Sequence, residues 1–289
     1  MDNTPKWTFY LFYIIITTFA FLYILFPSEA AKKYIAYNLK KSNPDLSINI
    51  NNVKPTFPPG LQLKGVSLFH LKDLLFGSED IKVKPALISF FKPPVTFVYK
   101  GRGYQGTFNG DLYLKGNVPQ TQFVVDFRMN HIQISEIPAV HWLSDYKISG
   151  FLNGKSTFDS SKGETGILDA KLQLSEGKIK LLASKYNIET LNFQNIEGDV
   201  EINMPKINIK RSQINGEQVS GSITGELIIN APFSQSGLNI SGTVIPHASF
   251  LKELSKVFPV ESFLSKKSGG MGFSFKIEGT LEKPKFSLL

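Results

Sequence analysis

The chain of 289 residues contains no cysteine, which excludes disulfide bonds, thiolate metal sites and a cysteine nucleophile. Arginine is nearly absent too: Arg102, Arg128 and Arg211 are the only three, so lysine carries most of the formal net charge of +8. Specific phosphate recognition usually uses the planar fork of arginine. We therefore expect no nucleic-acid partner, and we interpret the lysine excess as a source of solubility and of mild attraction to anionic membrane surfaces.

Motifs for catalysis and for cofactor binding are missing as well. The four histidines form no H-x-x-x-H or H-x-H pair, which are the usual spacings of metal ligands. Residues 153–157 resemble the end of a phosphate-binding loop, but the first glycine is absent and the pattern continues as a strand. His141, Ser144 and Asp145 have the residue types for acyl transfer but lack a nucleophile elbow. We expect no metal, no cofactor and no enzymatic activity.

One long hydrophobic run is present near the N-terminus. Residues 8–27 contain no charge over 20 residues, and a helix of that length spans a hydrocarbon core of roughly 30 Å. A cleaved signal peptide competes with this interpretation, because residues 28–30 loosely imitate a cleavage site, but the run exceeds the usual apolar length of about 7–15 residues. The sequence predicts a retained membrane anchor, with the apolar side chains Phe9, Leu11, Ile14, Ile15, Phe19, Leu22, Ile24 and Phe26.

An amphipathic helix is predicted directly after the anchor, over residues 28–41. Ala31, Ile35 and Leu39 recur on one face, which can lie on the bilayer surface or pack against the following domain. The same segment makes the C-terminal flank of the anchor the more basic one, through Lys32, Lys33, Lys40 and Lys41. By the rule that the more basic flank of a membrane helix stays in the cytoplasm, this lysine excess places the large domain in the cytoplasm. The rule weakens when a long domain follows the helix.

From Leu46 onward, apolar residues alternate with polar ones in short segments separated by turn residues. This pattern predicts a mainly β fold, a long antiparallel sheet of about a dozen or more strands. We expect three parts: a stub and anchor over 1–27, a helix and linker over 28–45, and a β-rich domain over 46–289. The clearest apolar stripes are Phe123, Val125, Phe127 and Met129, and later Phe273, Phe275 and Ile277. They either fill a closed core or line a groove for a lipid acyl chain.

Glycine recurs two residues after an apolar residue in four predicted strands, at Gly150, Gly221, Gly242 and Gly279. Glycine inside a strand marks a bulge, a bend or a close approach of backbones, and a sheet that curls needs such points. The alternative is that glycine is simply common in β proteins. One short helix is predicted over 249–258, with Ser249 as a half-formed N-cap because Lys252 replaces the glutamate of a capping box, and a further helical turn is possible over 71–76.

Two turn motifs carry a family resemblance. Residues 59–68 follow the pattern Pro-Gly-Leu-x-Leu-x-x-Val-x-Leu, beginning with Pro59, Gly60 and Leu61. The chain ends with a glycine-rich segment and Gly-Thr-Leu-x-x-Pro, which includes Gly279, Thr280 and Pro284. The predicted anchor, the first motif and the C-terminal segment together resemble the type II secretion system protein N family in its stand-alone form. The final motif is also similar to the end of AsmA-like domains.

This resemblance implies a bacterial inner-membrane protein that crosses the membrane once, with its large domain in the periplasm. It implies an accessory component of type II secretion that acts by contact with other subunits, and it brings no catalytic residues. The AsmA-like relation implies a curled, U-shaped open sheet with an apolar inner face, a shape associated with phospholipid passage. A lipid-binding or lipid-transfer module is therefore the alternative function.

Overall fold

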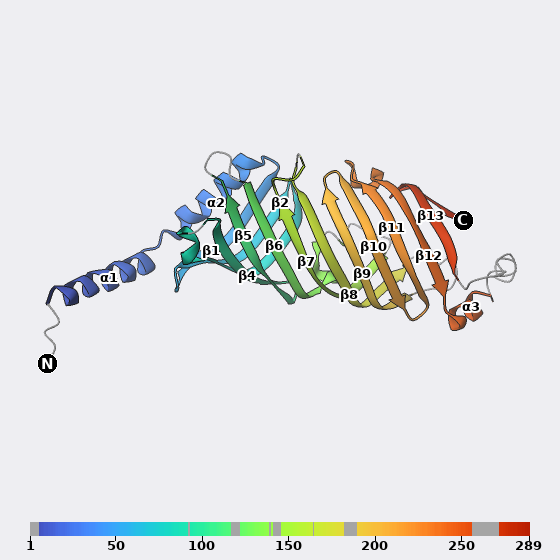
Figure 1. Cartoon of the computed structure of the whole chain (residues 1–289), viewed down its shortest axis with the longest axis horizontal. Helices are drawn as coiled ribbons and strands as arrows, with labels where there is room; N and C mark the ends of the chain where they lie inside the picture. The colour runs from blue at the N-terminus through green and yellow to red at the C-terminus, as the bar shows by residue number, and fades with distance from the viewer. Residues whose placement is uncertain are drawn as a thin grey trace. The chain divides into compact units, whose positions relative to one another are not determined.

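The computed structural model describes residues 6–91, 93–116, 122–138, 140, 146–163, 165–181, 190–255 and 272–289. Within these ranges, two N-terminal helices, α1 (Lys6–Ile24) and α2 (Ser28–Ser42), precede fourteen strands (Figure 1). The strands are β1 (Leu46–Thr56), β2 (Gly60–His70), β3 (Asp73–Pro85), β4 (Val95–Gly103), β5 (Gly106–Lys115), β6 (Gln122–Gln133), β7 (Tyr146–Asp159), β8 (Ile167–Leu181), β9 (Thr190–Asn203), β10 (Lys206–Gly216), β11 (Val219–Ile228), β12 (Gly237–Pro246), β13 (Phe273–Thr280) and β14 (Pro284–Leu288). A third helix, α3 (Ala248–Leu254), follows β12.

The strands form one open antiparallel sheet, in which each strand lies beside its neighbours in the sequence. The order runs from β1 to β14 without a crossover. Antiparallel neighbours can be joined by tight turns, and the alternating pattern leaves one apolar and one polar face on each strand. The predicted mainly β fold with one long antiparallel sheet is confirmed.

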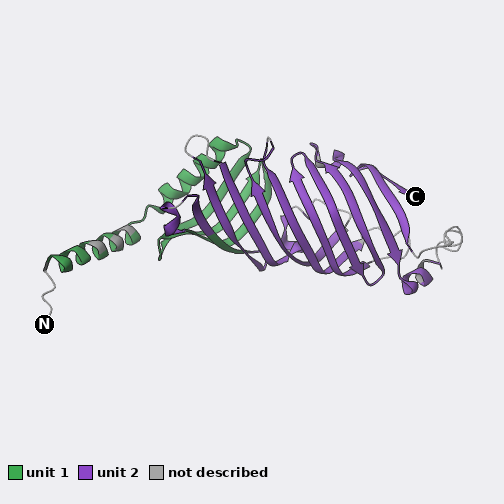
Figure 2. Cartoon of the chain, in the orientation of Figure 1, with its two compact units in different colours: residues 1–85, 99–102 green, residues 86–98, 103–289 purple. Residues whose placement is uncertain are grey.

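The chain divides into two compact units (Figure 2). Unit 1 comprises residues 1–85 and 99–102, and unit 2 comprises residues 86–98 and 103–289. Unit 1 therefore holds α1, α2 and β1–β3, whereas unit 2 holds β5–β14. The division falls inside the stretch 46–289, for which the sequence predicts one β-rich domain.

Unit 1 has a closed hydrophobic core. Its centre consists of Ile50, Val53 and Val66, which are 5%, 1% and 4% exposed. Ala31 and Ile35 of α2 pack against this centre, so α2 covers the apolar face of β1 and β2. Of the two roles that the sequence leaves open for this helix, the structure supports packing against the following domain. Among the described residues, the half-buried hydrophobic residues that pack against the centre are Phe26, Ala31, Ile35, Ile48, Leu61, Leu63 and Ile81.

The start of α2 also hydrogen-bonds to β1, the first strand of the sheet. The backbone N–H of Val53 donates to Ser28 Oγ at 3.2 Å, and the Ser28 hydroxyl donates to Asn52 Oδ1 at 3.2 Å. A side chain of α2 thus satisfies a backbone donor of β1.

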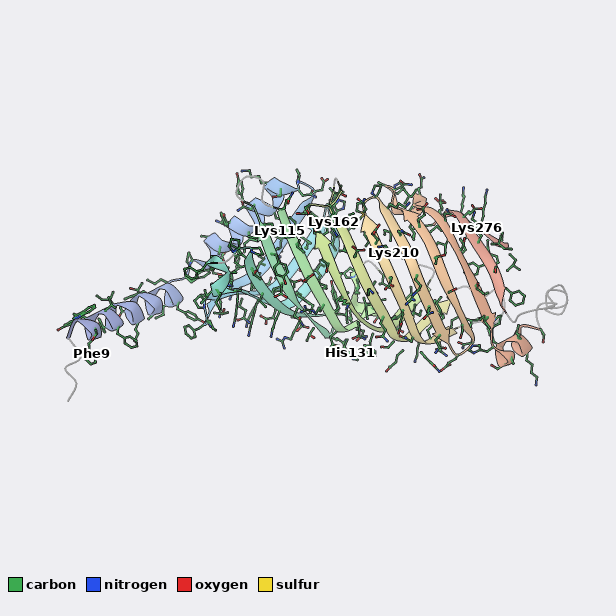
Figure 3. All side chains as sticks on the ribbon, in the orientation of Figure 1. Phe9, Lys115, His131, Lys162, Lys210 and Lys276 are labelled. Atoms are coloured by element: carbon green, nitrogen blue, oxygen red, sulfur yellow. The ribbon has the colours of Figure 1, made fainter. Side chains whose placement is uncertain are left out.

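Helix α1 covers most of the predicted anchor, and Phe9 lies near its start (Figure 3). Phe9, Leu11, Ile14 and Ile24 are exposed, and Phe26 is half-buried against the core of unit 1. For the remaining predicted anchor residues, Ile15, Phe19 and Leu22, the structure describes the backbone but not the side chains. In the part of the chain that the structure describes, no helix combines the length and the hydropathy needed to cross a membrane. The membrane anchor stays a prediction.

The glycines singled out in the strands show two of the expected local effects. Gly150 has φ 135° and lies where the pairing of β7 with β8 shifts between Ser149 and Phe151, which confirms a bulge. Gly221 pairs regularly, but a Cβ at this position would collide with the carbonyl oxygen of Thr243. That geometry is the predicted close approach of backbones.

The predicted helical turn over residues 71–76 is wrong. Leu71 and Lys72 form the tight turn between β2 and β3, and Leu71 has φ 55°. Phe76 lies in β3, opposite Leu68. Pairing of β3 with β2 uses the backbone groups that a helical turn would need.

The late helix is confirmed in part. It begins at Ala248, and the N–H of Leu251 donates to the carbonyl oxygen of His247 at 2.9 Å. Ser249 therefore lies inside the helix and is not its N-cap, because the first intrahelical bond already starts at His247. Residues 256–258 of the predicted segment lie outside the described residues.

Candidate functional site

The strand register of unit 2 aligns its apolar residues in continuous rows. Side chains directly opposite each other in an antiparallel pair lie on the same face, so successive pairs from β5 to β14 define each row. The middle row is Gly110, Phe127, Ser156, Ala170, Val200, Ile209, Gly225, Ile240, Ile277 and Phe286. The flanking rows are Phe108, Met129, Gly154, Leu172, Gly198, Ser212, Ile223, Gly242, Phe275 and Leu288, and Leu112, Val125, Phe158, Leu168, Ile202, Ile207, Leu227, Leu238, Gly279 and Pro284. We call these three rows the apolar face of unit 2.

The residues predicted to line a groove all lie on the side of the sheet that carries the apolar face. Phe127 and Ile277 belong to the middle row. Phe123 and Phe273 lie at the same parity on β6 and β13, beyond the three rows. The strands β7–β12 separate the two stripes by about 34 Å along the sheet, at about 4.8 Å per strand. The structure therefore places both stripes on one face without bringing them into contact; the full set is Phe123, Val125, Phe127, Met129, Phe273, Phe275 and Ile277.

Few side chains of the apolar face are buried by the described part of the chain. Phe108, Ala170 and Phe275, at 4%, 7% and 8% exposure, are the buried hydrophobic residues of the three rows. Aromatic rings shield each other along the face: Phe108 stacks on Phe127 with ring centroids 5.5 Å apart, and Phe275 on Phe286 at 5.8 Å. The other hydrophobic side chains of the rows are half-buried or exposed. This arrangement leaves apolar area that a ligand could remove from water.

The opposite face of the same strands is polar and charged. One of its rows consists of Asp111, Asp126, Thr157, Asp169, Glu201, Asn208, Glu226, Asn239, Glu278 and Lys285. Asp169 and Glu201 are directly opposite, and like charges in that position repel. Lys210, which is labelled in Figure 3, lies in a bulge of β10 and offsets this repulsion. Its Nζ lies 3.0 Å from Asp169 Oδ1 and 2.7 Å from Glu201 Oε2. The hydrogen bonds that Lys210 donates to Glu201 and Asp169 raise its pKa above the usual 10.5.

Two hollows lie on this polar face, over β6–β10, with volumes of about 460 and 560 Å³. Both are lined by Arg128, Lys155, Lys171 and Asp199. The first has four basic and three acidic side chains around it, so it favours neither anions nor cations strongly. Among the described residues, no three histidine, aspartate or glutamate side chains gather where they could hold a metal ion. We interpret the hollows as spaces between the long side chains of a solvated face.

A serine–histidine pair that the sequence analysis missed lies at one end of unit 2. Ser220 Oγ is 2.9 Å from His247 Nε2, and His247 Nδ1 is 2.9 Å from the backbone oxygen of Glu217. A hydrolytic triad has a carboxylate at Nδ1, which stabilises the charged imidazole, whereas here a carbonyl oxygen occupies that place. The backbone N–H of His247 also donates to Gln218 O at 2.8 Å. We interpret the pair as a structural tie between the β10–β11 turn and the start of α3.

The residues of the two family motifs form hairpin turns. Pro59 is exposed between β1 and β2, Gly60 pairs with Thr56, and Leu61 packs against the core of unit 1. At the other end, Gly279 pairs with Pro284, and the N–H of Lys283 donates to Thr280 Oγ1 at 3.1 Å. The first motif lies in unit 1 and the second in unit 2. Turn geometry accounts for the glycine and proline residues of both motifs, and core packing accounts for Leu61.

The remaining sequence candidates contribute no site. Residues 153–157 lie within β7, as the continued strand pattern predicts, so they do not form a phosphate-binding loop before a helix. His141, Ser144 and Asp145 lie outside the described residues.

Comparison of the chain with family models, with curated proteins and with solved structures gave no match.

Proposed function

We propose that the apolar face of unit 2 binds the acyl chains of phospholipids, as part of a lipid-binding or lipid-transfer module. One observation carries the proposal: three register-aligned rows cross β5–β14, and few of their hydrophobic side chains are buried. Each methylene that leaves water for such a surface contributes about 0.8 kcal/mol. The AsmA-like resemblance adds the expectation that this sheet curves around the lipid in a U shape.

The competing interpretation is a closed core filled by protein side chains. Gly198 distinguishes the two, because a Cβ built there has its nearest neighbour, Arg211 O, at 3.8 Å. A Cβ at Gly198 therefore meets only ordinary van der Waals neighbours, and a larger side chain there would point to the side of the sheet that carries the apolar face. If the face binds acyl chains, Gly198→Leu should reduce the lipid that copurifies with the full chain and leave its thermal unfolding temperature nearly unchanged.

A photo-crosslinking experiment tests the proposal directly. We would replace Val200, in the middle row, by a photoreactive phenylalanine, mix the full chain with vesicles of phosphatidylethanolamine and phosphatidylglycerol, and irradiate. Mass spectrometry should find phospholipid adducts at this position. The matched control places the same group at Asp199, whose side chain lies on the polar face. Absence of adducts at position 200, or equal yields at both positions, would contradict acyl-chain binding by this face.

A second candidate function is supported by the two turn motifs and the uncharged run at residues 8–27. In this proposal the chain is an accessory component of type II secretion, anchored in the bacterial inner membrane, with its large domain in the periplasm and in contact with other secretion subunits. Cells that lack the chain should then retain exported enzymes in the periplasm, and wild-type protein should restore their release. Normal secretion in such cells would exclude this function and leave the lipid proposal intact.

The orientation can be tested independently. A reporter enzyme that is active only outside the cytoplasm, fused after Leu289, should be active if the large domain is periplasmic. Activity of only a cytoplasmic reporter would instead support the orientation that the lysine count favours.

A further inference from the structure

The last described strand, β14, leaves one edge of the sheet open. All five of its residues are exposed, with Phe286 at 61% and Leu288 at 46%. It pairs with β13, and no described strand lies beyond it. Phe286 and Leu288 end two rows of the apolar face, so these rows reach the open edge.

The open edge presents backbone donors and acceptors. The N–H of Leu289 donates to Ser274 O at 2.9 Å, which fixes the side of β14 that faces β13. Because N–H and C=O groups alternate between the two sides of an antiparallel strand, those of Phe286 and Leu288 point away from β13. At the other end of the sheet, Ser28 of α2 accepts the N–H of Val53 in β1. No comparable side-chain contact to β14 is present in the described part of the chain.

We propose that β14 pairs with β14 of a second copy of this chain, antiparallel and centred on Ser287. Phe286 would then lie opposite Leu288 of the second copy, and the outward N–H and C=O groups of both residues would be paired. Pro284, which has no N–H, falls outside this segment and costs no hydrogen bond. The inference concerns assembly and does not depend on lipid binding.

A second copy fits this edge for two reasons. A two-fold axis perpendicular to the sheet keeps both apolar faces on the same side, so Phe286 and Leu288 of each copy pair across the junction. The only charged side chain of β14 is Lys285. In the proposed register, the two Lys285 residues are offset by four positions, or roughly 13 Å along the strands, so like charges are not opposed. The paired segment is short, so the free dimer should be weak, and covalent capture is the appropriate measurement.

The absence of cysteine makes the register testable with a single substitution. Ser287 faces its own symmetry mate in a non-hydrogen-bonded pair, where Cα atoms are about 4.5 Å apart and a disulfide fits. The full chain with Ser287→Cys, oxidised in mild detergent, should form a disulfide-linked dimer on a non-reducing gel. Lys285→Cys, equally exposed on the same strand, should remain monomeric. No dimer at position 287, or equal dimer formation by both variants, would overturn the proposal.

A further substitution separates edge pairing from random collision. Leu288→Pro removes an N–H that points to the open edge and leaves the bonds to β13 in place. Combined with Ser287→Cys, it should abolish most of the disulfide dimer without changing the circular dichroism spectrum. An unchanged yield of dimer would show that the cysteines meet without strand pairing and would overturn the proposal.

Discussion

Unit 1 and unit 2 are built from the same kind of antiparallel hairpins but differ in what covers their apolar faces. In unit 1, α2 covers the sheet, and Val53 is only 1% exposed. In unit 2, the only α-helix among the described residues is α3, whose seven residues span about 10 Å. Strands β5–β14 extend over about 43 Å at 4.8 Å per strand, so α3 cannot cover them. Alternation of apolar and polar residues therefore specifies a sheet face but does not determine what covers it.

The largest expected difference in unfolding free energy is between substitutions of a buried valine and of a half-buried one. Val53→Asp places an unpaired carboxylate in the core of unit 1 and should cost about 3–5 kcal/mol of unfolding free energy. Val200→Asp, on the apolar face of unit 2, should cost about 1 kcal/mol because water can reach the new carboxylate. Chemical denaturation followed by circular dichroism measures both. Equal losses would mean that the face of unit 2 is a closed core.

Packing of α2 on the core of unit 1 should contribute measurably to the free energy of unfolding. Ile35→Ala removes methyl groups that pack on the core of unit 1 and should cost about 2 kcal/mol, at the low end for buried aliphatic truncation because Ile35 is half-buried. Tyr34→Ala is the matched control, since Tyr34 is 71% exposed on the same helix. Its effect on the denaturation midpoint should be close to zero. If the two variants behave alike, α2 does not cover unit 1 in solution.

Within unit 2, two glycines should respond differently to a methyl group. At Gly221 a Cβ would collide with Thr243 O, so Gly221→Ala should cost about 1–3 kcal/mol. At Gly198 the nearest atom is 3.8 Å away, and Gly198→Ala should be neutral or stabilise by about 0.5 kcal/mol through the unfolded state. Thermal unfolding of the two variants tests this difference. Destabilisation by Gly198→Ala would argue against room for a side chain at this position of the apolar face.

The smallest expected effect concerns the polar face. A lysine whose pKa is raised in the folded state contributes stability fully below its ordinary pKa, here 10.5, and loses that contribution as the pH rises through the raised value. Lys210→Met should therefore lower the thermal unfolding temperature slightly at neutral pH, and 1 M salt should shrink the difference. The control Lys171→Met removes a lysine without an ion pair among the described residues. A salt-independent loss would mean that Lys210 acts through packing.

The sequence predicts the strands and the face of each apolar residue, because alternation needs no knowledge of neighbouring strands. It assigns Phe127 and Ile277 to apolar stripes, but their common row depends on every turn and bulge between β6 and β13, including the bulge after Ile209. The helical prediction at 71–76 failed because pairing with β2 overrides local pattern. Ser220 and His247 were missed because they are 27 residues apart and meet only when β11 pairs with β12.

The sequential order of the strands has a consequence for how the protein forms. Every ladder joins strands that are consecutive in the chain, so each new strand needs only the one before it as a template. Each ladder reaches no further than the adjacent strand, so a chain that is synthesised from its N-terminus can add strands in the order of synthesis. Stability then accumulates ladder by ladder, as in repeat proteins. Loss of a terminal strand removes one ladder, whereas loss of a central strand removes two and separates the sheet.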